Sequence, residues 1–284
     1  MYTQEITRRH RAAFILALDR SGSMQERIRL GCMNITRAEA VTLMANALIT
    51  ELIDRCRRTD SLRNYYDIAV VGYGNDEVEM LLGKDGFVSV EELAKMTPER
   101  SDIAIEEELE DGSSAMVSHS VMQWLKPRAE GKTPMYEAML RIRDLVGDWC
   151  NDECNKECFP PIVINITDGE SSDCDDRELC DVCSQIRRTA TEDGNTLLLN
   201  IHISANNTIP SMVFPMAEEL TAADHYARTL AECSSIMPDV FNQAICQMKG
   251  VGAIPPFFGM GYNASIIELL SIINIGSRSV SNMQ

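Results

Sequence analysis

The sequence has no apolar run long enough to cross a bilayer. The run that begins at Phe14 is interrupted by Asp19, and the most apolar segment near the C-terminus, 264–275, is too short and contains Glu268. Residues 1–11 are polar and carry three arginines, which is not the pattern of a secretory signal. We therefore expect a cytoplasmic protein that does not bind membranes.

Basic residues are few. The chain has 26 Lys and Arg against 43 Asp and Glu, a formal net charge of −17. An acidic surface is repelled by nucleic acid and by anionic membranes, so nucleic acid is not an expected partner. The charge is first of all a source of solubility, and secondly it favours basic partners.

Nothing in the sequence divides the chain into separate domains. At 284 residues, with 45% hydrophobic and 24% charged residues, its size and composition are those of one large soluble domain. We find no internal repeat and no linker. The prediction is a single domain over 1–284, with a core from about 11 to 276 and a flexible tail at 277–284.

Apolar strand patterns alternate with helical patterns along the chain. Strands are expected at 12–18, 66–73, 162–167 and 197–204, and a short strand at 78–82 follows a Gly74-Asn75 turn. Helices are expected at 36–58, 90–95, 133–150, 176–191, 217–237, 240–248 and from 263 or 265 to 275, with surface loops at 25–34 and 98–132. This order predicts an α/β fold, a doubly wound, mostly parallel sheet with one antiparallel edge strand and helices on both faces.

Polar side chains follow the first strand in quick succession. Asp19, Ser21 and Ser23 come at alternate positions, and Gly22 allows a tight bend between the two serines. One carboxylate and two hydroxyls form an incomplete set of hard oxygen ligands, the kind that Mg²⁺ or Mn²⁺ accepts.

Two distant segments are placed to complete this set. Thr133 precedes Pro134 at the start of a predicted helix, which it is also expected to cap, and Asp168 ends the strand at 162–167. Asp19 and Asp168 both lie where a parallel strand ends, and open α/β sheets gather ligand groups at that edge. Each segment also has an ordinary structural explanation as a cap or a turn, but the three in this order are unlikely to arise by chance.

Together, Asp-x-Ser-x-Ser, Gly-x-Thr-Pro and Thr-Asp-Gly resemble the von Willebrand factor A-type domain. In that family they form the metal-ion-dependent adhesion site, and all five positions match: Asp19, Ser21, Ser23, Thr133 and Asp168. The resemblance extends from about Arg11 to the last helix and is nearest to stand-alone bacterial members of the tellurium-resistance type. It implies a Rossmann-like sheet of about six strands. It further implies a Mg²⁺ or Mn²⁺ ion that accepts a Glu or Asp from a partner protein, in an adaptor of a stress or phosphorylation-linked system.

The ligand types argue for the same ions. No His or Cys belongs to the set, which disfavours zinc, and Ca²⁺ usually takes more oxygen ligands and more carboxylates. A metal-dependent hydrolase, such as a phosphatase, is the alternative, because an open metal position can activate water. No evident His or Lys base accompanies the loops, and neither a Gly-x-Ser-x-Gly elbow nor a phosphate-binding loop around Lys132 is present. We therefore expect a binding module and no enzyme.

Cysteine is abundant and supports a third hypothesis, a structural zinc or redox protein. The ten cysteines are Cys32, Cys56, Cys150, Cys154, Cys158, Cys174, Cys180, Cys183, Cys233 and Cys246. The groups at 150–158 and 174–183 flank one strand, which argues against one shared site, and in a reducing compartment most are expected to be thiols. Cys180 and Cys183 also fit one helix face as buried, apolar side chains.

Two further features border the proposed metal. The acidic loop 170–176 is expected to be solvated, with Asp175 or Asp176 capping the next helix, or else to act as a rim that repels acidic competitors. His202 lies within an apolar strand, which predicts a core histidine instead of a metal ligand. The partner's identity and the oligomeric state do not follow from the sequence.

Overall fold

A computed structural model describes residues 1–30, 33–58, 61–83, 86–96, 98–108, 114–169, 171–203, 210–250, 252–264 and 268. The expected tail at 277–284 and nearly all of the expected last helix lie outside these residues.

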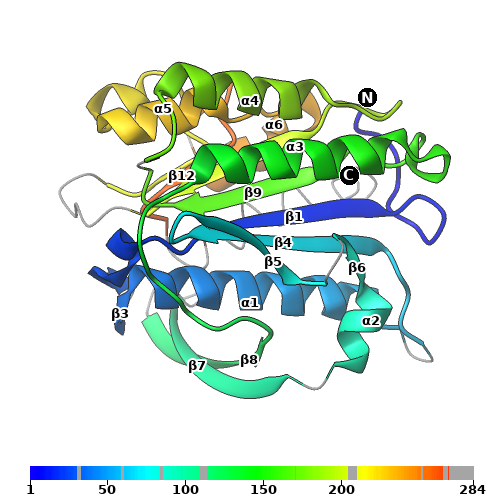
Figure 1. The fold of residues 1–284 in the computed structure, drawn as a ribbon, viewed down its shortest axis with the longest axis horizontal. Coiled ribbons are helices and arrows are strands. Elements are labelled where there is room, and N and C mark those ends of the chain that lie inside the picture. The colour runs from blue at the N-terminus through cyan, green and yellow to red at the C-terminus, as the bar shows by residue number, and fades with distance from the viewer. Residues whose placement is uncertain are drawn as a thin grey trace.

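Five parallel strands form the centre of an eight-stranded sheet (Figure 1). They are β1 (Ala12–Asp19), β4 (Tyr66–Gly74), β9 (Ile162–Thr167), β10 (Leu197–His202) and β12 (Met260–Tyr262). The order along the sheet is β11-β12-β10-β9-β1-β4-β5. Every residue of β1 is buried, because helices cover both faces, and this explains its unbroken apolar sequence.

Antiparallel strands finish the sheet at both edges. β5 (Glu77–Leu82) turns back on β4, as expected from the Gly74-Asn75 turn, and β6 (Val88–Ser89) also pairs with β4. At the opposite edge β11 (Met212–Val213) pairs with β12. The two-residue strands β6 and β11 were not predicted, because two residues carry no readable pattern.

The helices divide between the two faces of the sheet. α1 (Arg37–Cys56), α2 (Val90–Lys95) and α6 (Asp239–Lys249) share one core with side chains of β1 such as Leu16. α3 (Met135–Asn151), α4 (Asp176–Arg188) and α5 (His225–Cys233) share the other, with side chains such as Ile15. The predicted fold class, a doubly wound and mostly parallel α/β sheet, is confirmed.

Local capping agrees with the sequence at two helices. Thr36 and Glu39 form a capping box at the start of α1, and Asp175 with Glu178 forms another at the start of α4. In each pair, the side chain of either residue accepts a hydrogen bond from the backbone N–H of the other. The two bonds satisfy two N–H groups that have no partner within the helix. Of the two residues expected to cap α4, Asp175 is the one that does so.

Three predictions of local structure are wrong. Residues 25–34 are not a loop: a short 3₁₀ turn (Gly22–Gln25) ends at Gln25, and β2 (Arg27–Leu30) pairs with β3 (Met33–Thr36) as a hairpin. Residues 98–132 contain a second hairpin of β7 (Glu99–Glu108) and β8 (Ser114–Gln123), which lies beside α1 (Figure 1). Residues 217–237 are not one helix. They contain the 3₁₀ turn Glu219–Ala222 and then α5, whose N-terminus is capped by Asp224, which accepts a hydrogen bond from Ala227 N. Another 3₁₀ turn, Glu153–Asn155, follows α3.

No helix in the described part of the chain has both the length and the apolar character needed to cross a membrane.

Candidate metal centre

The loop after β1 folds its polar side chains toward one another. Asp19 Oδ1 accepts from the Ser21 backbone N–H at 2.9 Å, and Asp19 Oδ2 accepts from the Thr167 hydroxyl at 2.7 Å. The hydroxyls of Ser21 and Ser23 lie 3.1 Å apart. The carboxylate is thereby fixed at the carboxyl edge of the sheet, with the paired hydroxyls directly after it.

The segment that precedes Thr133 is bound to this first loop through backbone atoms. Gly22 N donates to Gly131 O at 2.8 Å, and Glu130 N donates to Arg20 O at 2.8 Å. Gly131 has a φ of +63°, and a Cβ there would lie 2.5 Å from the Asn75 Cα, so the close approach requires glycine. Thr133 follows Gly131 by two positions, so these contacts bring it close to the loop that carries Ser21.

The segment that contains Asp168 closes against Thr133. Ser172 N donates to Thr133 O at 3.0 Å, and Thr133 N donates to Ser172 Oγ at 2.9 Å. The three segments predicted from the sequence therefore meet, at the carboxyl edge of β1 and β9, which is the left end of the sheet in Figure 1.

The five predicted residues differ in exposure. Asp19 and Ser21 are each 1% exposed and Thr133 is 6% exposed, whereas the side chain of Asp168 is 7% exposed and Ser23 is an exposed residue. Solvent therefore reaches this group from the side of Ser23.

Two carboxylates interact within this buried group. Burial, and then the negative charge of Asp168, raise the pKa of Asp19 to about 6, although hydrogen bonds from Ser21 and Thr167 act in the opposite direction. Oδ1 of Asp168 is buried and has no hydrogen-bond partner among the described residues. A buried, unpartnered carboxylate oxygen beside a second carboxylate and several hydroxyls fits a hard divalent cation.

Arg37 is a neighbour of Asp168 that the sequence analysis missed. Its Nη1 lies 3.0 Å from Asp168 Oδ2 and its Nη2 lies 2.8 Å from Glu26 Oε2. The Arg37 side chain is 9% exposed and that of Asp168 is 7% exposed, so both members of the pair are buried. Arg37 begins α1, and no spacing in the sequence relates it to a residue 131 positions away.

His202 is a core residue, as expected, but it also supports the site. It is 2% exposed and stacks on Tyr262, and burial lowers the pKa of its imidazole. Its Nε2 donates to the Asp168 carbonyl oxygen at 2.6 Å, which holds the backbone of the third segment in place. Gly169 has a φ of +96°, and a Cβ there would lie 2.7 Å from the imidazole.

The prediction that Thr133 caps α3 is wrong. Pro134 occupies the N-cap position without a side-chain bond. Asp173 in the acidic loop performs the capping, with Oδ1 accepting from Tyr136 N at 3.1 Å and Oδ2 accepting from Glu137 N at 3.0 Å. The Thr133 hydroxyl is therefore not engaged in capping, and Asp173, although exposed as expected for this loop, also ties the loop to α3.

Cysteine contacts occur at two separate places. Cys158 Sγ contacts the carbonyl oxygens of Arg9 and Cys154, whereas Cys180 Sγ contacts Cys233 Sγ. All nine described cysteines are free thiols. Within the described residues, no three His, Cys, Asp or Glu side chains are grouped to hold a metal ion, and the five-residue set discussed above contains only two carboxylates.

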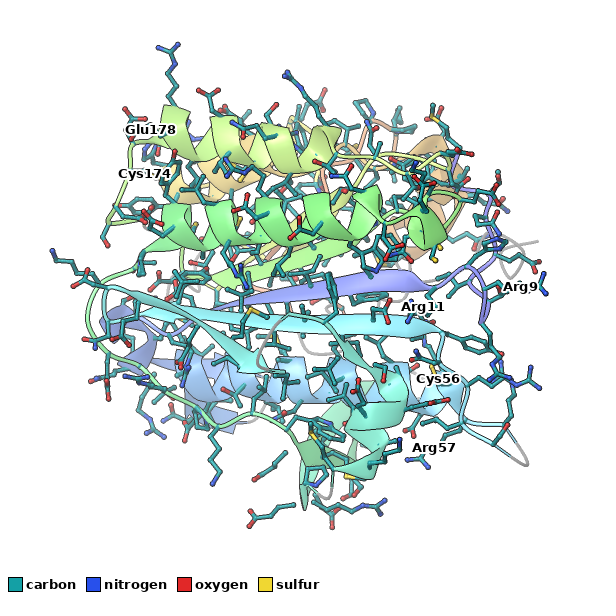
Figure 2. All side chains as sticks on the ribbon, turned by 45° about the vertical axis from the view of Figure 1, so that its right-hand side comes forward. Arg9, Arg11, Cys56, Arg57, Cys174 and Glu178 are labelled. Atoms are coloured by element: carbon teal, nitrogen blue, oxygen red, sulfur yellow. The ribbon has the colours of Figure 1, made fainter. Side chains whose placement is uncertain are left out.

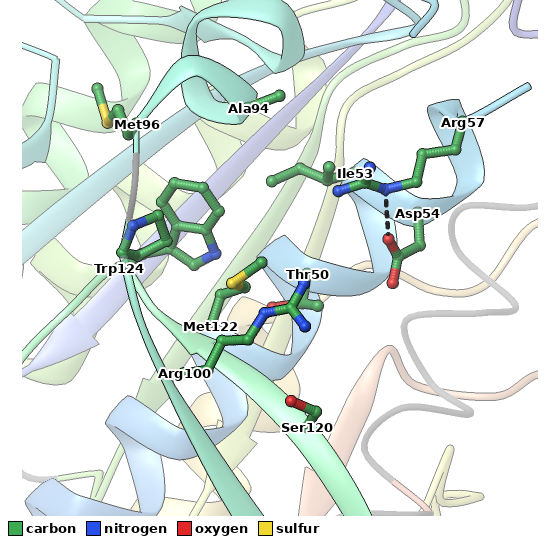
Figure 3. A pocket seen from close by; sticks show the side chains of 11 residues that line it. Thr50, Ile53, Asp54, Arg57, Ala94, Met96, Arg100, Ser120, Met122 and Trp124 are labelled. Carbon is green, nitrogen blue, oxygen red and sulfur yellow. Dashed lines mark hydrogen bonds and ion pairs between the residues drawn. The ribbon is translucent and has the colours of Figure 1, made fainter. Parts of the chain in front are cut away.

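A pocket of about 310 Å³ lies elsewhere, between α1, α2 and the β7–β8 hairpin (Figure 3). Its wall on α1 runs from Thr50 to Arg57, and Thr50 is roughly 20 Å along the helix from Arg37. Arg57 in this wall is paired with Asp54 at 2.9 Å. The pocket is thus separate from the candidate metal centre.

The basic residues near the N-terminus lie at the opposite end of the sheet from the candidate centre (Figure 2). Figure 2 shows Cys174 and Glu178 at the end where the candidate centre lies, and Arg9 and Arg11 at the opposite end. Arg11 is paired with Asp67 at 2.8 Å. The basic N-terminal residues therefore do not border the candidate centre.

Comparisons of sequence found no match, either to a family model or to a curated protein. Solved structures that resemble the chain include the von Willebrand factor domain of the type V pili tip protein Mfa5 from Porphyromonas gingivalis, at 9% identity and a TM-score of 0.48, covering 99% of this chain and 98% of that one. A von Willebrand factor type A protein from Catenulispora acidiphila is 12% identical with a TM-score of 0.37, covering 79% and 43%. The SpRpn10 VWA domain is 9% identical with a TM-score of 0.38, covering 69% and 83%. At identities and scores this low, the likeness does not assign the chain to a family.

Proposed function

We propose that this chain is a metal-dependent protein-binding module of the von Willebrand factor A type. Asp19, Ser21, Ser23, Thr133 and Asp168 would hold Mg²⁺ or Mn²⁺, and the ion would accept a carboxylate from a partner protein. The observation that carries the proposal is the meeting of three distant segments, joined by backbone hydrogen bonds, around a buried Asp168 oxygen that has no partner among the residues that the structure describes.

The roles of the five residues follow from their chemistry. The Ser21 and Ser23 hydroxyls, 3.1 Å apart, suit direct coordination of one ion. Thr133 contributes a hydroxyl that is not used for capping. Asp19 already accepts two hydrogen bonds, so it suits a contact to the ion through water or through one free lone pair.

The charge around the ion favours an anionic visitor. Arg37 neutralises Asp168, which leaves the single charge of Asp19 against the two charges of the cation. The occupied site would keep a net positive charge, and an acidic side chain of a partner is the group that completes it. Mg²⁺ commonly keeps positions for water or for an outside ligand, so an exchangeable position is expected.

We further propose that the site binds without catalysing a reaction. The imidazole near Asp168 belongs to His202, which is buried and whose Nε2 is already used as a donor. Its other ring nitrogen, Nδ1, is buried and has no hydrogen-bond partner among the described residues, so no hydrogen bond links it to the five residues of the centre. The sequence resemblance to tellurium-resistance-type bacterial proteins supports a cytoplasmic adaptor in a stress or phosphorylation-linked system.

Direct binding of Mn²⁺ tests the metal part of the proposal. Titration followed by electron paramagnetic resonance is expected to give one bound ion per chain, displaced by Mg²⁺. Asp19→Ala and Asp168→Ala should abolish this binding. Asp181→Ala, which removes an exposed carboxylate on α4, is the matched control and should bind normally. If wild-type protein binds no ion, the proposal is wrong.

Acetate then tests the open position. Water proton relaxation by the bound Mn²⁺ should fall as acetate displaces a coordinated water molecule. An acidic partner should be retained in Mg²⁺ and released by chelator. If acetate does not change the relaxation caused by bound Mn²⁺, the metal site stands but the proposed binding of a partner carboxylate to the ion is wrong.

A further inference from the structure

Two cysteines from different helices are in contact on the α3–α4–α5 face. Cys180 Sγ of α4 and Cys233 Sγ at the end of α5 lie 3.2 Å apart, although 53 positions separate them in the chain. The two helices pack side by side (Figure 1). The sequence pairs Cys180 with Cys183 in a Cys-x-x-Cys motif, but in the folded chain the Cys180 sulfur contacts that of Cys233.

The surrounding contacts hold these two thiols in position. Arg187, two turns after Cys180, donates from Nη1 to the Ser234 carbonyl oxygen at 2.7 Å and so fixes the residue that follows Cys233. At the other end of the helices, His225 Nε2 lies 2.9 Å from Asp176 Oδ2. α4 and α5 are therefore joined on both sides of the sulfur contact.

The two thiols differ in access. Cys233 is completely buried, whereas Cys180 is partly exposed. Cys183 is buried at 2% exposure and also contributes to the raised pKa of Cys233. A small solute would thus meet Cys180 first, and Cys233 is placed behind it as the thiol that reacts second.

We propose that Cys180 and Cys233 form a redox modification site, in which a hydroperoxide oxidises the pair to a disulfide that joins α4 to α5. A disulfide bond is about 2.05 Å long, so the sulfurs must approach by roughly 1 Å. The proposal is independent of the metal centre.

The reaction balances in two steps. The Cys180 thiolate attacks the peroxide, the O–O bond breaks, and the products are Cys180 sulfenic acid and an alcohol or water. The Cys233 sulfur then attacks the Cys180 sulfur, the S–O bond breaks, and the hydroxide leaves as water with the proton from Cys233. Two thiols lose two electrons and two protons in total, and one peroxide is reduced.

The protonation state of the thiols sets the rate. The pKa of Cys180 is raised, first by its hydrogen bond to Cys233 and then by burial, and the pKa of Cys233 is also raised. Because the thiolate is the nucleophile, we expect oxidation to accelerate as the pH rises.

The test uses the full, reduced chain in chelator with hydrogen peroxide as the oxidant. Intact mass should fall by two hydrogens, and peptide mapping should identify a Cys180–Cys233 bond. Accessible thiols measured in denaturant should decrease from ten to eight. A chain that keeps ten thiols, or one whose bond joins Cys180 to Cys183, would overturn the proposal.

Three serine variants identify the roles, each checked for folding by circular dichroism. The Cys180→Ser chain should form at least tenfold less of the cross-linked product than the wild type. Cys233→Ser should lose it equally but accumulate a sulfenic acid at Cys180 that dimedone traps. Cys183→Ser is the matched control and should form the Cys180–Cys233 bond at the wild-type level. If the folded Cys183→Ser chain fails to form it, the assignment of Cys233 as the second thiol is wrong.

Discussion

The Arg37 guanidinium lies 3.0 Å from the Asp168 carboxylate, and both groups are buried. The positive charge of an arginine is thus held beside a residue proposed to bind a cation. It stabilises the metal-free fold, because Asp168 would otherwise be a buried and unpaired carboxylate. It also opposes the binding of a second positive charge, so Arg37 is expected to set the affinity of the site for its ion.

Replacement of Arg37 by glutamine separates these two effects. Arg37→Gln should tighten Mn²⁺ binding at least tenfold, about 1.4 kcal/mol, because the competing cation is removed. It should also lower the free energy of unfolding of the metal-free protein by about 3–5 kcal/mol. Mn²⁺ titration and denaturant unfolding in chelator measure the two quantities.

Glu26→Gln is the matched control, since it removes the other partner of Arg37. The Glu26 side chain is 60% exposed, so its loss should change stability by less than about 1 kcal/mol. Weaker Mn²⁺ binding in Arg37→Gln would contradict the prediction and show that Arg37 is needed to orient Asp168.

The raised pKa of Asp19 predicts how metal binding depends on pH. Its pKa is about 6 in the metal-free fold, against about 3.9 in an unfolded chain. Between these values the folded state holds a proton that the unfolded state has lost, so the stability of the metal-free protein falls as the pH rises through this window. A metal ion requires the deprotonated carboxylate, so Mn²⁺ affinity should fall up to about tenfold per pH unit below about pH 6.

Mn²⁺ titrations between about pH 5 and pH 7 check this, together with thermal unfolding in chelator. In Asp19→Asn the decline in metal-free stability with rising pH should be smaller, because the group that titrates is gone. An Mn²⁺ affinity that stays constant over this range would show that Asp19 does not contribute to binding as a carboxylate.

The parts of the fold that could be predicted are those where burial determines the sequence. β1, β4, β9 and β10 are covered on both faces, so their apolar runs are unbroken. The position of Asp19 and Asp168 at the carboxyl edge follows from the same runs. The β7–β8 hairpin was missed because its first strand carries Glu and Asp among its apolar residues and has no clear alternation.

Long-range partners left no local signal. Arg37 with Asp168 and Cys180 with Cys233 are joined by packing between helices and strands, and a single sequence contains no spacing that links them. Thr133 before a proline has the pattern of a capping residue, but a carboxylate from another loop occupies the helix N-terminus instead. The sequence therefore indicated the three loops of the candidate centre but not the groups that hold them.

Asp173 is expected to support the centre through the start of α3. Asp173→Ala removes the acceptor for Tyr136 N and Glu137 N and should cost about 1 kcal/mol of stability. Because the same loop bonds to Thr133, Mn²⁺ affinity should fall as well. Asp173→Asn keeps one of the two oxygen acceptors and should retain part of both the stability and the affinity. Equal behaviour of the alanine and asparagine variants would contradict capping as the cause.

Gly74 lies where β4 touches the loop that follows β1, and its substitution tests how rigid that contact is. A Cβ at this position would lie 2.4 Å from the Arg20 carbonyl oxygen, a backbone atom that precedes Ser21. Gly74→Ala should therefore displace the loop, lower stability by about 1–3 kcal/mol and weaken Mn²⁺ binding. Denaturant unfolding and Mn²⁺ titration measure both effects.

Gly147 provides the comparison for the same change of residue. It lies within α3, and a Cβ there would meet nothing within 4 Å. Gly147→Ala should stabilise the protein by about 0.5–1 kcal/mol, since alanine loses less backbone entropy in a helix, and should leave Mn²⁺ binding unchanged. If Gly74→Ala behaved like Gly147→Ala, the loop after β1 would be able to shift without loss of the site, and the close packing of Arg20 on β4 would not be what positions Ser21.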